Sequence, residues 1–358
     1  MPQKKKSSPK KKRPSTGATT ARSSVLRVGV DLGTSRSAIS ASNGKRKWVE
    51  SYVGWPKDFI SEKVLGEPVL FGAHALENRL SLDLYRPLAQ GVIKEGTSRD
   101  EEAVRELVAH LLDLVEVKVE QTVYAVVGVP AESLRANKMA IKKATEDFVD
   151  SLMVVSEPFS AAYGRGVLNN AIVIDIGAGT VDFCIMHGSM PTDDDQRTIV
   201  TAGDYVDQQL FDMLKEKYPE SGFNMNMVRS WKEQYSFVGN LKTKVEVEIP
   251  VSGKPMIHDI TAEVKRACES IIPGLLENTL ELIARFDPEY QGIVRENIIL
   301  AGGGSQIRGL AKHLESELKE DGPCKVSVVE DPIFAGSDGA LALAQDMPDR
   351  YWEDLIEE

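Results

Sequence analysis

The sequence predicts an α/β protein built from two duplicated domains with a cleft between them. The first observation behind this prediction is a repeated unit in which an apolar strand runs into an aspartate and a Gly/Thr turn, and a second strand returns. One copy occupies 28–41 and the other 171–186. A repeat this long indicates two halves that face each other rather than a solenoid. The second observation is that buried strands alternate with amphipathic helices, which is typical of helices packed on sheets.

Each element of the first half follows from its local pattern. After the first repeated unit, apolar residues at helical spacing predict a helix, and an apolar run that ends at a proline predicts a buried strand. A second helix, a short apolar strand and a third helix complete this half. These expected elements are a helix at 100–118, a strand at 124–130, a helix at 133–149, a strand at 153–155 and a helix through 161–163.

The second half repeats the alternation. Expected helices lie at 205–217, 225–238, 261–285 and 305–319, and expected strands lie near 244–250, 296–301 and 325–330. A loop at 332–339 then opens a final helix.

The predicted domain boundaries follow from these elements. Domain I covers 25–165 with a smaller subdomain at about 50–100, and helices at about 336–358 return to it. Domain II covers 166–335 with a smaller subdomain at about 205–260. A basic tail, 1–24, precedes both and is expected to be disordered, because Lys, Arg, Ser, Pro, Thr and Gly dominate it.

Composition limits the class of protein. The 358 residues include 42% hydrophobic and 27% charged residues but only 3 cysteines, which excludes a disulfide scaffold and full-length disorder. No apolar stretch is long enough to cross a membrane, and the N-terminus has no secretory apolar segment. Scattered cysteines fit a reducing compartment, so we expect a cytoplasmic protein.

Charge is distributed unevenly along the chain. The net charge is −11, yet residues 1–27 carry nine basic and no acidic residues, so the body is strongly acidic. An acidic body is not expected to bind nucleic acid. The basic tail is able to contact an anionic membrane or another acidic partner, or it simply keeps the protein soluble.

The two aspartate turns have the composition of phosphate-binding loops. Glycine lets the backbone approach an anion closely, and hydroxyl groups add donors to the backbone N–H groups. Two such turns facing each other would hold a polyphosphate, and Asp31 and Asp175 would hold Mg²⁺ through water, since Mg²⁺ keeps most of its hydration shell. The alternative is that each aspartate only stabilises its own turn. The candidate phosphate contacts are Gly33, Thr34 and Ser35 in the first turn and Gly177, Ala178, Gly179 and Thr180 in the second.

Two further segments suit the same site. The strand at 298–301 leads into three consecutive glycines, and such a loop allows close backbone approach to a ligand, although a lone triple glycine is usually a flexible turn. Glu157 follows a strand and precedes a proline, where a carboxylate is able to activate a water for attack on a terminal phosphate. A carboxylate at this position is equally suited to stabilise the amino end of a helix through the helix dipole.

Five motifs in order resemble the signatures of the actin/heat-shock chaperone/sugar-kinase ATPase superfamily. They are the segments 31–35, 157–158, 175–182, 302–305 and 336–340. The resemblance implies an actin-like ATPase fold that binds ATP or ADP with Mg²⁺, phosphate loops at the first and third segments, and an adenosine loop at the fourth. It also implies that Glu157 positions the attacking water, with Asp175 as the second catalytic residue. Further implied nucleotide contacts are Asp31, Asp182, Gly203, Asp204, Lys232, Glu233, Gly302, Gly303, Gly304 and Ser305.

Finer matches narrow the resemblance to bacterial actins. Ala38 stands where eukaryotic actin has a phosphate-binding lysine, which leaves open what supplies positive charge to the terminal phosphate. The segments 156–159, 232–239, 288–291 and 301–311 are similar to the bacterial actins that form filaments alongside magnetosomes. This similarity implies a cytoplasmic, cytoskeletal ATPase that polymerises with itself on binding Mg-ATP and disassembles on hydrolysis. It further implies that the filament aligns or positions magnetosomes through magnetosome-associated proteins.

Two other functions remain open on this fold. A small-molecule kinase would need an acceptor pocket and a base for the acceptor hydroxyl, and no segment outside the shared motifs stands out as one. A membrane-tethered scaffold with incidental ATPase activity would depend on the basic tail, and fold resemblance does not decide between these functions.

Overall fold

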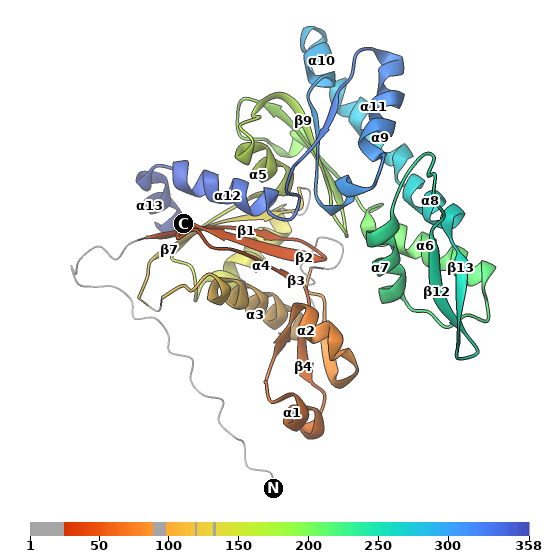
Figure 1. Cartoon of the computed structure of the whole chain (residues 1–358). Coiled ribbons are helices and arrows are strands. Elements are labelled where there is room, and N and C mark those ends of the chain that lie inside the picture. The colour runs from red at the N-terminus through yellow and green to blue at the C-terminus, as the bar shows by residue number, and fades with distance from the viewer. Residues whose placement is uncertain (1–24, 89–97, 119, 132–133, 358) are drawn as a thin grey trace.

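The computed structural model describes residues 25–88, 98–118, 120–131 and 134–357, so the predicted basic tail lies outside the described residues (Figure 1). No helix in the part of the chain that is described is both long enough and apolar enough to cross a membrane.

The first sheet has the strand order β3-β2-β1-β7-β8. Its first three strands are antiparallel neighbours, and β7 and β8 continue parallel to β1. Its strands are β1 Leu26–Leu32, β2 Arg36–Ala41, β3 Arg46–Glu50, β7 Val123–Val129 and β8 Ser151–Ser156.

The second sheet repeats this arrangement with the order β11-β10-β9-β14-β15 and the same strand directions. Asp31 lies opposite Ala38 in the first sheet, and Asp175 lies opposite Asp182 in the second. The duplication predicted from the two aspartate units is therefore confirmed. The strands are β9 Asn169–Ile176, β10 Val181–His187, β11 Gln196–Ile199, β14 Ile298–Ala301 and β15 Val326–Val328.

Helices cover both sheets because each presents a buried apolar face to its neighbours. The first sheet packs on α3 Ser98–Leu114 and α4 Leu134–Thr145. The second packs on α8 Thr261–Glu269, α9 Ile272–Ile283, α10 Pro288–Arg295 and α11 Leu310–Leu318. The predicted single helix at 261–285 was wrong, because α9 begins anew with a proline in its first turn. The predicted helix at 305–319 is likewise shorter, since Gly309 precedes α11 with φ of 87°.

Two smaller units flank the open side of the cleft. Beside the first sheet lie β4 Val53–Pro56, α1 Phe59–Leu65, β5 Leu70–Phe71, α2 Gly72–Glu77 and β6 Leu82–Tyr85. Beside the second lie α6 Gly203–Lys217, α7 Met225–Tyr235, β12 Glu246–Val251 and β13 Lys254–Asp259. The strand β13 was missed from the sequence because its side chains are largely exposed and show no apolar alternation.

The two sheets meet across a pair of glycine-bearing helices. In Figure 1, α5 Glu157–Gly164 and α12 Ala335–Asp346 lie between them. A β-carbon on Gly339 would lie 1.8 Å from the Ser160 carbonyl oxygen, and one on Gly29 would lie 2.1 Å from the Ser337 carbonyl oxygen. Glycine thus lets α12 press against both α5 and β1. The chain then ends on the first sheet through α13 Asp349–Glu357, whose Trp352 is fully buried.

Candidate functional site

A pocket of about 410 Å³ lies between the two sheets, at the carboxyl ends of β1 and β9. This is the usual position for a ligand in α/β folds, and the volume is in the range of small-molecule sites. Seventeen residues predicted from the sequence line it together. They are Asp31, Gly33, Thr34, Ser35, Glu157, Asp175, Gly177, Ala178, Gly179, Thr180, Gly203, Asp204, Lys232, Glu233, Gly302, Gly303 and Gly304.

Hydrogen bonds fix the shape of both turns. In the first turn, the Ser51 hydroxyl donates to the Gly33 carbonyl at 2.6 Å and the Thr34 hydroxyl donates to the Leu88 carbonyl at 2.7 Å. In the second, the Gly177 N–H donates to the Thr180 carbonyl at 2.9 Å. Both turns are therefore held in place before any ligand binds, which lowers the cost of ordering them.

The start of α6 is attached to the second turn. The Gly203 N–H donates to the Gly177 carbonyl at 3.1 Å, and the Asp204 N–H donates to the Ala178 carbonyl at 2.7 Å. The amino end of a helix carries partial positive charge, so α6 adds to the attraction of this wall for an anion.

Glycines allow two loops to close directly over the aspartates. A β-carbon on Gly302, where φ is 70°, would lie 2.3 Å from the Asp175 Oδ1 atom. A β-carbon on Gly336 would likewise lie 2.3 Å from the Asp31 Oδ2 atom. No larger residue fits at either position, and the backbone of each loop forms part of the pocket floor.

The floor of the pocket concentrates buried acidic groups. Burial raises the pKa of Asp31 to about 7. Burial first, and then the charges of Asp31, Asp182 and Asp175, raise the pKa of Glu157 well above its usual range. Burial, with Asp31 and Asp182, does the same to the pKa of Asp175. Carboxyl groups that raise one another's pKa in this way are stabilised in their charged form by a cation among them.

Glu157 keeps an oxygen for a ligand or water. The residue is 7% exposed, and its Oε1 atom is buried without a hydrogen-bond partner in the described protein. Such an atom is costly unless a further group satisfies it. Across the described ranges, no group of three or more His, Cys, Asp or Glu side chains is placed to hold a metal directly. The acidic floor nevertheless fits a hydrated Mg²⁺ held through water by Asp31 and Asp175.

Two predicted contacts do not line the pocket. Asp182 is 1% exposed and accepts hydrogen bonds from the Ala131 N–H at 2.8 Å and from the hydroxyls of Thr180 and Thr198 at 2.7 and 2.5 Å. Its carboxylate thus holds the second turn to the loop after β7. Ser305 is also buried, and its hydroxyl donates back to the Gly302 carbonyl at 2.7 Å.

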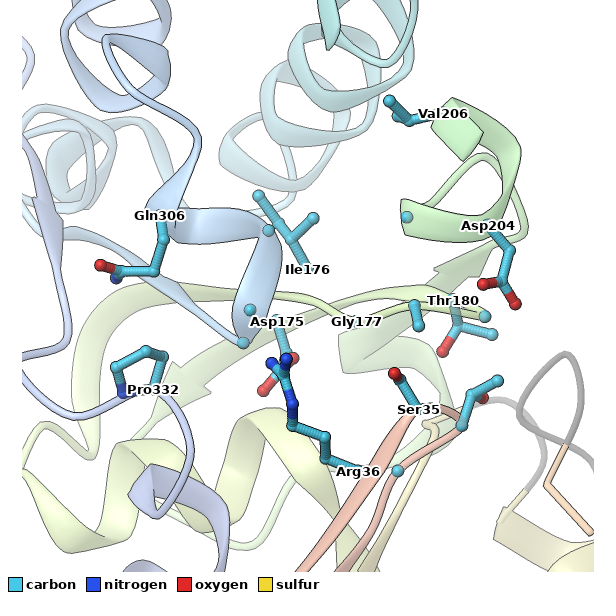
Figure 2. A pocket seen from close by; sticks show the side chains of 18 of the residues that line it. Ser35, Arg36, Asp175, Ile176, Gly177, Thr180, Asp204, Val206, Gln306 and Pro332 are labelled. Atoms are coloured by element: carbon cyan, nitrogen blue, oxygen red, sulfur yellow. The ribbon is translucent and has the colours of Figure 1, made fainter. Parts of the chain in front are cut away.

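Several residues of the wall, among them two arginines, were not predicted from the sequence. Figure 2 shows Ser35 and Arg36 extending into the pocket from the first sheet. Arg36 directly follows the first turn, so its position alone was a usable signal. Arg229 precedes Lys232 by three residues and therefore lies on the same face of α7. The remaining missed residues of the wall are Pro130, Ile176, Val206, Ser236, Ile271, Gln306, Ile307, Pro332 and Ile333.

Several known proteins are similar to this chain in sequence. A family model described as MreB/Mbl protein matches residues 71–350. The actin-like protein MamK of Paramagnetospirillum magneticum is 43% identical over 330 residues, which cover 92% of this chain and 95% of that protein. The actin-like protein MamK of Magnetospirillum gryphiswaldense is 43% identical over 327 residues, or 91% of each chain.

Solved structures give the same likeness in three dimensions. A MamK double helical filament superposes with a TM-score of 0.89 at 43% identity, covering 91% of this chain and 100% of that one. A non-polymerising MamK mutant bound to AMPPNP superposes with a TM-score of 0.71, also at 43% identity, covering 90% of this chain and 100% of the mutant chain.

Proposed function

Because this chain belongs to the MreB/Mbl family of actin-like proteins, we propose that it is a cytoskeletal ATPase. It polymerises into filaments on binding Mg-ATP and disassembles after hydrolysis. The main observation behind this proposal is that two duplicated aspartate turns, a triple-glycine loop and the amino end of a helix all line one pocket. The MamK relatives and the filament of MamK support the self-association part of this proposal.

Each wall of the pocket has a distinct role in holding the nucleotide. The turns after β1 and β9 hold the phosphates through backbone N–H groups and hydroxyls, and the start of α6 adds its dipole. The glycine loop after β14 lies against the adenosine. Bound Mg²⁺ would neutralise phosphate charge, and Asp31 and Asp175 are the residues that would hold it through water. The structure of a MamK mutant with AMPPNP supports a nucleotide as the ligand.

Glu157 is the residue we assign to hydrolysis. Its unpartnered Oε1 atom faces a pocket in which the terminal phosphate would lie between the two turns. Bound Mg²⁺ would lower the raised pKa of Glu157, and the ionised carboxylate is able to orient a water and accept its proton. Asp175 would complete the catalytic pair by holding the hydrated Mg²⁺ through water.

Magnetosomes are the cargo we propose for the filament. The likeness to MamK over nine-tenths of the chain supports a partner among magnetosome-associated proteins and a filament along the magnetosome chain. In this proposal, hydrolysis-driven disassembly allows the filament to reposition its cargo.

The test combines light scattering with negative-stain microscopy, with and without Mg-ATP. Wild type should form filaments with Mg-ATP, and Glu157→Ala should form filaments that persist while phosphate release falls about 10²- to 10⁴-fold. Glu146→Ala, which removes an exposed glutamate, should behave as wild type.

Two results would count against the proposal. Phosphate release at the wild-type rate from Glu157→Ala would leave Glu157 with only a helix-start role. ATP consumption without polymer at any protein concentration would favour a small-molecule kinase instead.

A further inference from the structure

Within the described ranges, three side-chain contacts join the two halves of the molecule across the open side of the cleft. Arg86 forms two hydrogen bonds with Asp204, from Nη1 at 2.6 Å and from Nη2 at 3.1 Å. Arg229 donates to the Tyr52 hydroxyl at 2.9 Å. The Arg36 guanidinium donates to the Glu233 carboxylate at 3.0 Å. Each contact links one half of the duplicated fold to the other, so together they hold the smaller units against each other.

Arg86 differs from the other two arginines because it also binds a phosphate turn. Its Nε atom donates to the Thr34 carbonyl in the first turn at 2.8 Å. Its partner Asp204 is bonded through its N–H to the Ala178 carbonyl in the second turn at 2.7 Å. One side chain therefore connects the backbones of both phosphate turns through a single ion pair.

The environment of this pair favours a strong contact. The side chains of Arg86 and Asp204 are 18% and 30% exposed, whereas those of Arg36 and Glu233 are 37% and 42% exposed. Partial burial reduces screening by water and salt, and the two-bond geometry of arginine with a carboxylate fixes orientation as well as distance. Arg229 also lies 3.5 Å from Asp204 and 3.1 Å from the buried Asp207. Arg86 is thus part of a charged network that spans the cleft.

The fold as a whole is closer to a subunit of the MamK filament than to the non-polymerising MamK mutant. This structure superposes better on the MamK filament, with a TM-score of 0.89, than on the non-polymerising mutant, with 0.71. Identity is 43% in both comparisons and coverage is nearly equal, so neither of them accounts for the difference in TM-score.

We propose that Arg86 is a positioning residue that locks the cleft in its closed arrangement by tying the first phosphate turn to Asp204 at the start of α6. Because of this lock, the two phosphate turns close around a nucleotide at the same time as the smaller units approach each other. The consequence for polymerisation rests on the proposed function, because a filament needs subunits of one fixed shape.

The test measures the distance between the smaller units in the full chain with Mg-AMPPNP, at protein concentrations below polymerisation. Spin labels go on Glu77→Cys in α2 and Asn226→Cys in α7, two exposed positions, because the native Cys184, Cys268 and Cys324 are buried. The labelled protein that keeps Arg86 should give one narrow distance distribution by pulsed electron paramagnetic resonance. Arg86→Gln should broaden it towards longer distances.

Three companion measurements separate a lock from general destabilisation. Arg86→Gln should raise the critical concentration for AMPPNP-driven polymerisation about tenfold, the effect expected for one part-buried charged contact. Arg86→Lys keeps the charge without the two-bond geometry and should recover part of both effects. Arg79→Gln removes an exposed arginine that bonds to the Leu76 carbonyl within the same smaller unit, and it should match wild type.

The outcomes separate this inference from the proposed function. An unchanged distance distribution in Arg86→Gln overturns the lock, even if that variant unfolds more easily. If the unmodified protein does not polymerise at all, the proposed function fails, and the distance measurement still decides whether Arg86 closes the cleft.

Discussion

Replacing Asp182 with alanine should destabilise the fold more than it weakens nucleotide binding. The carboxylate is 1% exposed and accepts from three donors, the Ala131 N–H and the hydroxyls of Thr180 and Thr198. Hydrogen bonds to a charged group contribute about 1.5 kcal/mol each at the lower end, or about 4–5 kcal/mol for three. We therefore expect a loss of about 4–5 kcal/mol in the free energy of unfolding.

Urea unfolding followed by circular dichroism measures this loss in nucleotide-free protein. Asp182→Asn is the matched control, because its amide oxygen still accepts from the Ala131 N–H while the like charge is removed. Its loss should be about 1 kcal/mol. A fluorescent ATP analogue, titrated with Mg²⁺, measures the affinity of each variant that remains folded.

One combination of results would refute the reasoning. If Asp182→Ala unfolds within about 0.5 kcal/mol of wild type but loses nucleotide affinity a hundredfold, Asp182 contacts the nucleotide rather than anchoring the second turn.

Three further predictions follow from the packing and charges of the site. Gly302→Ala should unfold at lower temperature and bind nucleotide more weakly, because its β-carbon would lie 2.3 Å from a buried carboxylate oxygen. Thermal melting of Gly303→Ala, whose β-carbon would meet no atom within 4 Å, should match wild type. The pKa of Asp31 is raised to about 7, so the folded nucleotide-free protein holds a proton on Asp31 that the unfolded chain releases. The free energy of unfolding measured in urea should therefore fall as pH rises from about 5 to 8. Asp31→Asn should make that fall less steep. Trp352→Ala should lower the free energy of unfolding in urea by about 3–5 kcal/mol, because the side chain is fully buried. Tyr351→Ala is the control, since this side chain is 47% exposed, and the loss should be below about 0.5 kcal/mol. Equal losses for the two variants would show that α13 is not anchored through the tryptophan.

The α/β actin-like fold was predictable because its signals are local. A strand, an aspartate, a Gly/Thr turn and a returning strand occupy a short stretch of chain, and both copies at 28–41 and 171–186 form as predicted. Boundaries were less predictable where no apolar period exists. The exposed strand β13 and the division of 261–285 into two helices are examples.

The candidate site was likewise predictable only in part from the sequence. The glycine loops and the aspartates of the two turns could be recognised from neighbouring residues, and seventeen of the predicted site residues line one pocket. The anchoring of the second turn by Asp182 was not visible, because its partner Ala131 lies on another strand–loop unit. The signature motif identified the residue but not the direction in which its carboxylate points.

By itself, the sequence determined the duplication, the two aspartate turns and the glycines that allow backbone to approach a ligand, since these depend on residues adjacent in the chain. Only the tertiary structure decided that Arg86 joins Thr34 to Asp204 and that Arg36 faces Glu233. These pairs are brought together by the packing of two sheets through α5 and α12. It also decided the raised pKa of Asp31, because that shift comes from how deeply the finished fold buries the carboxyl group.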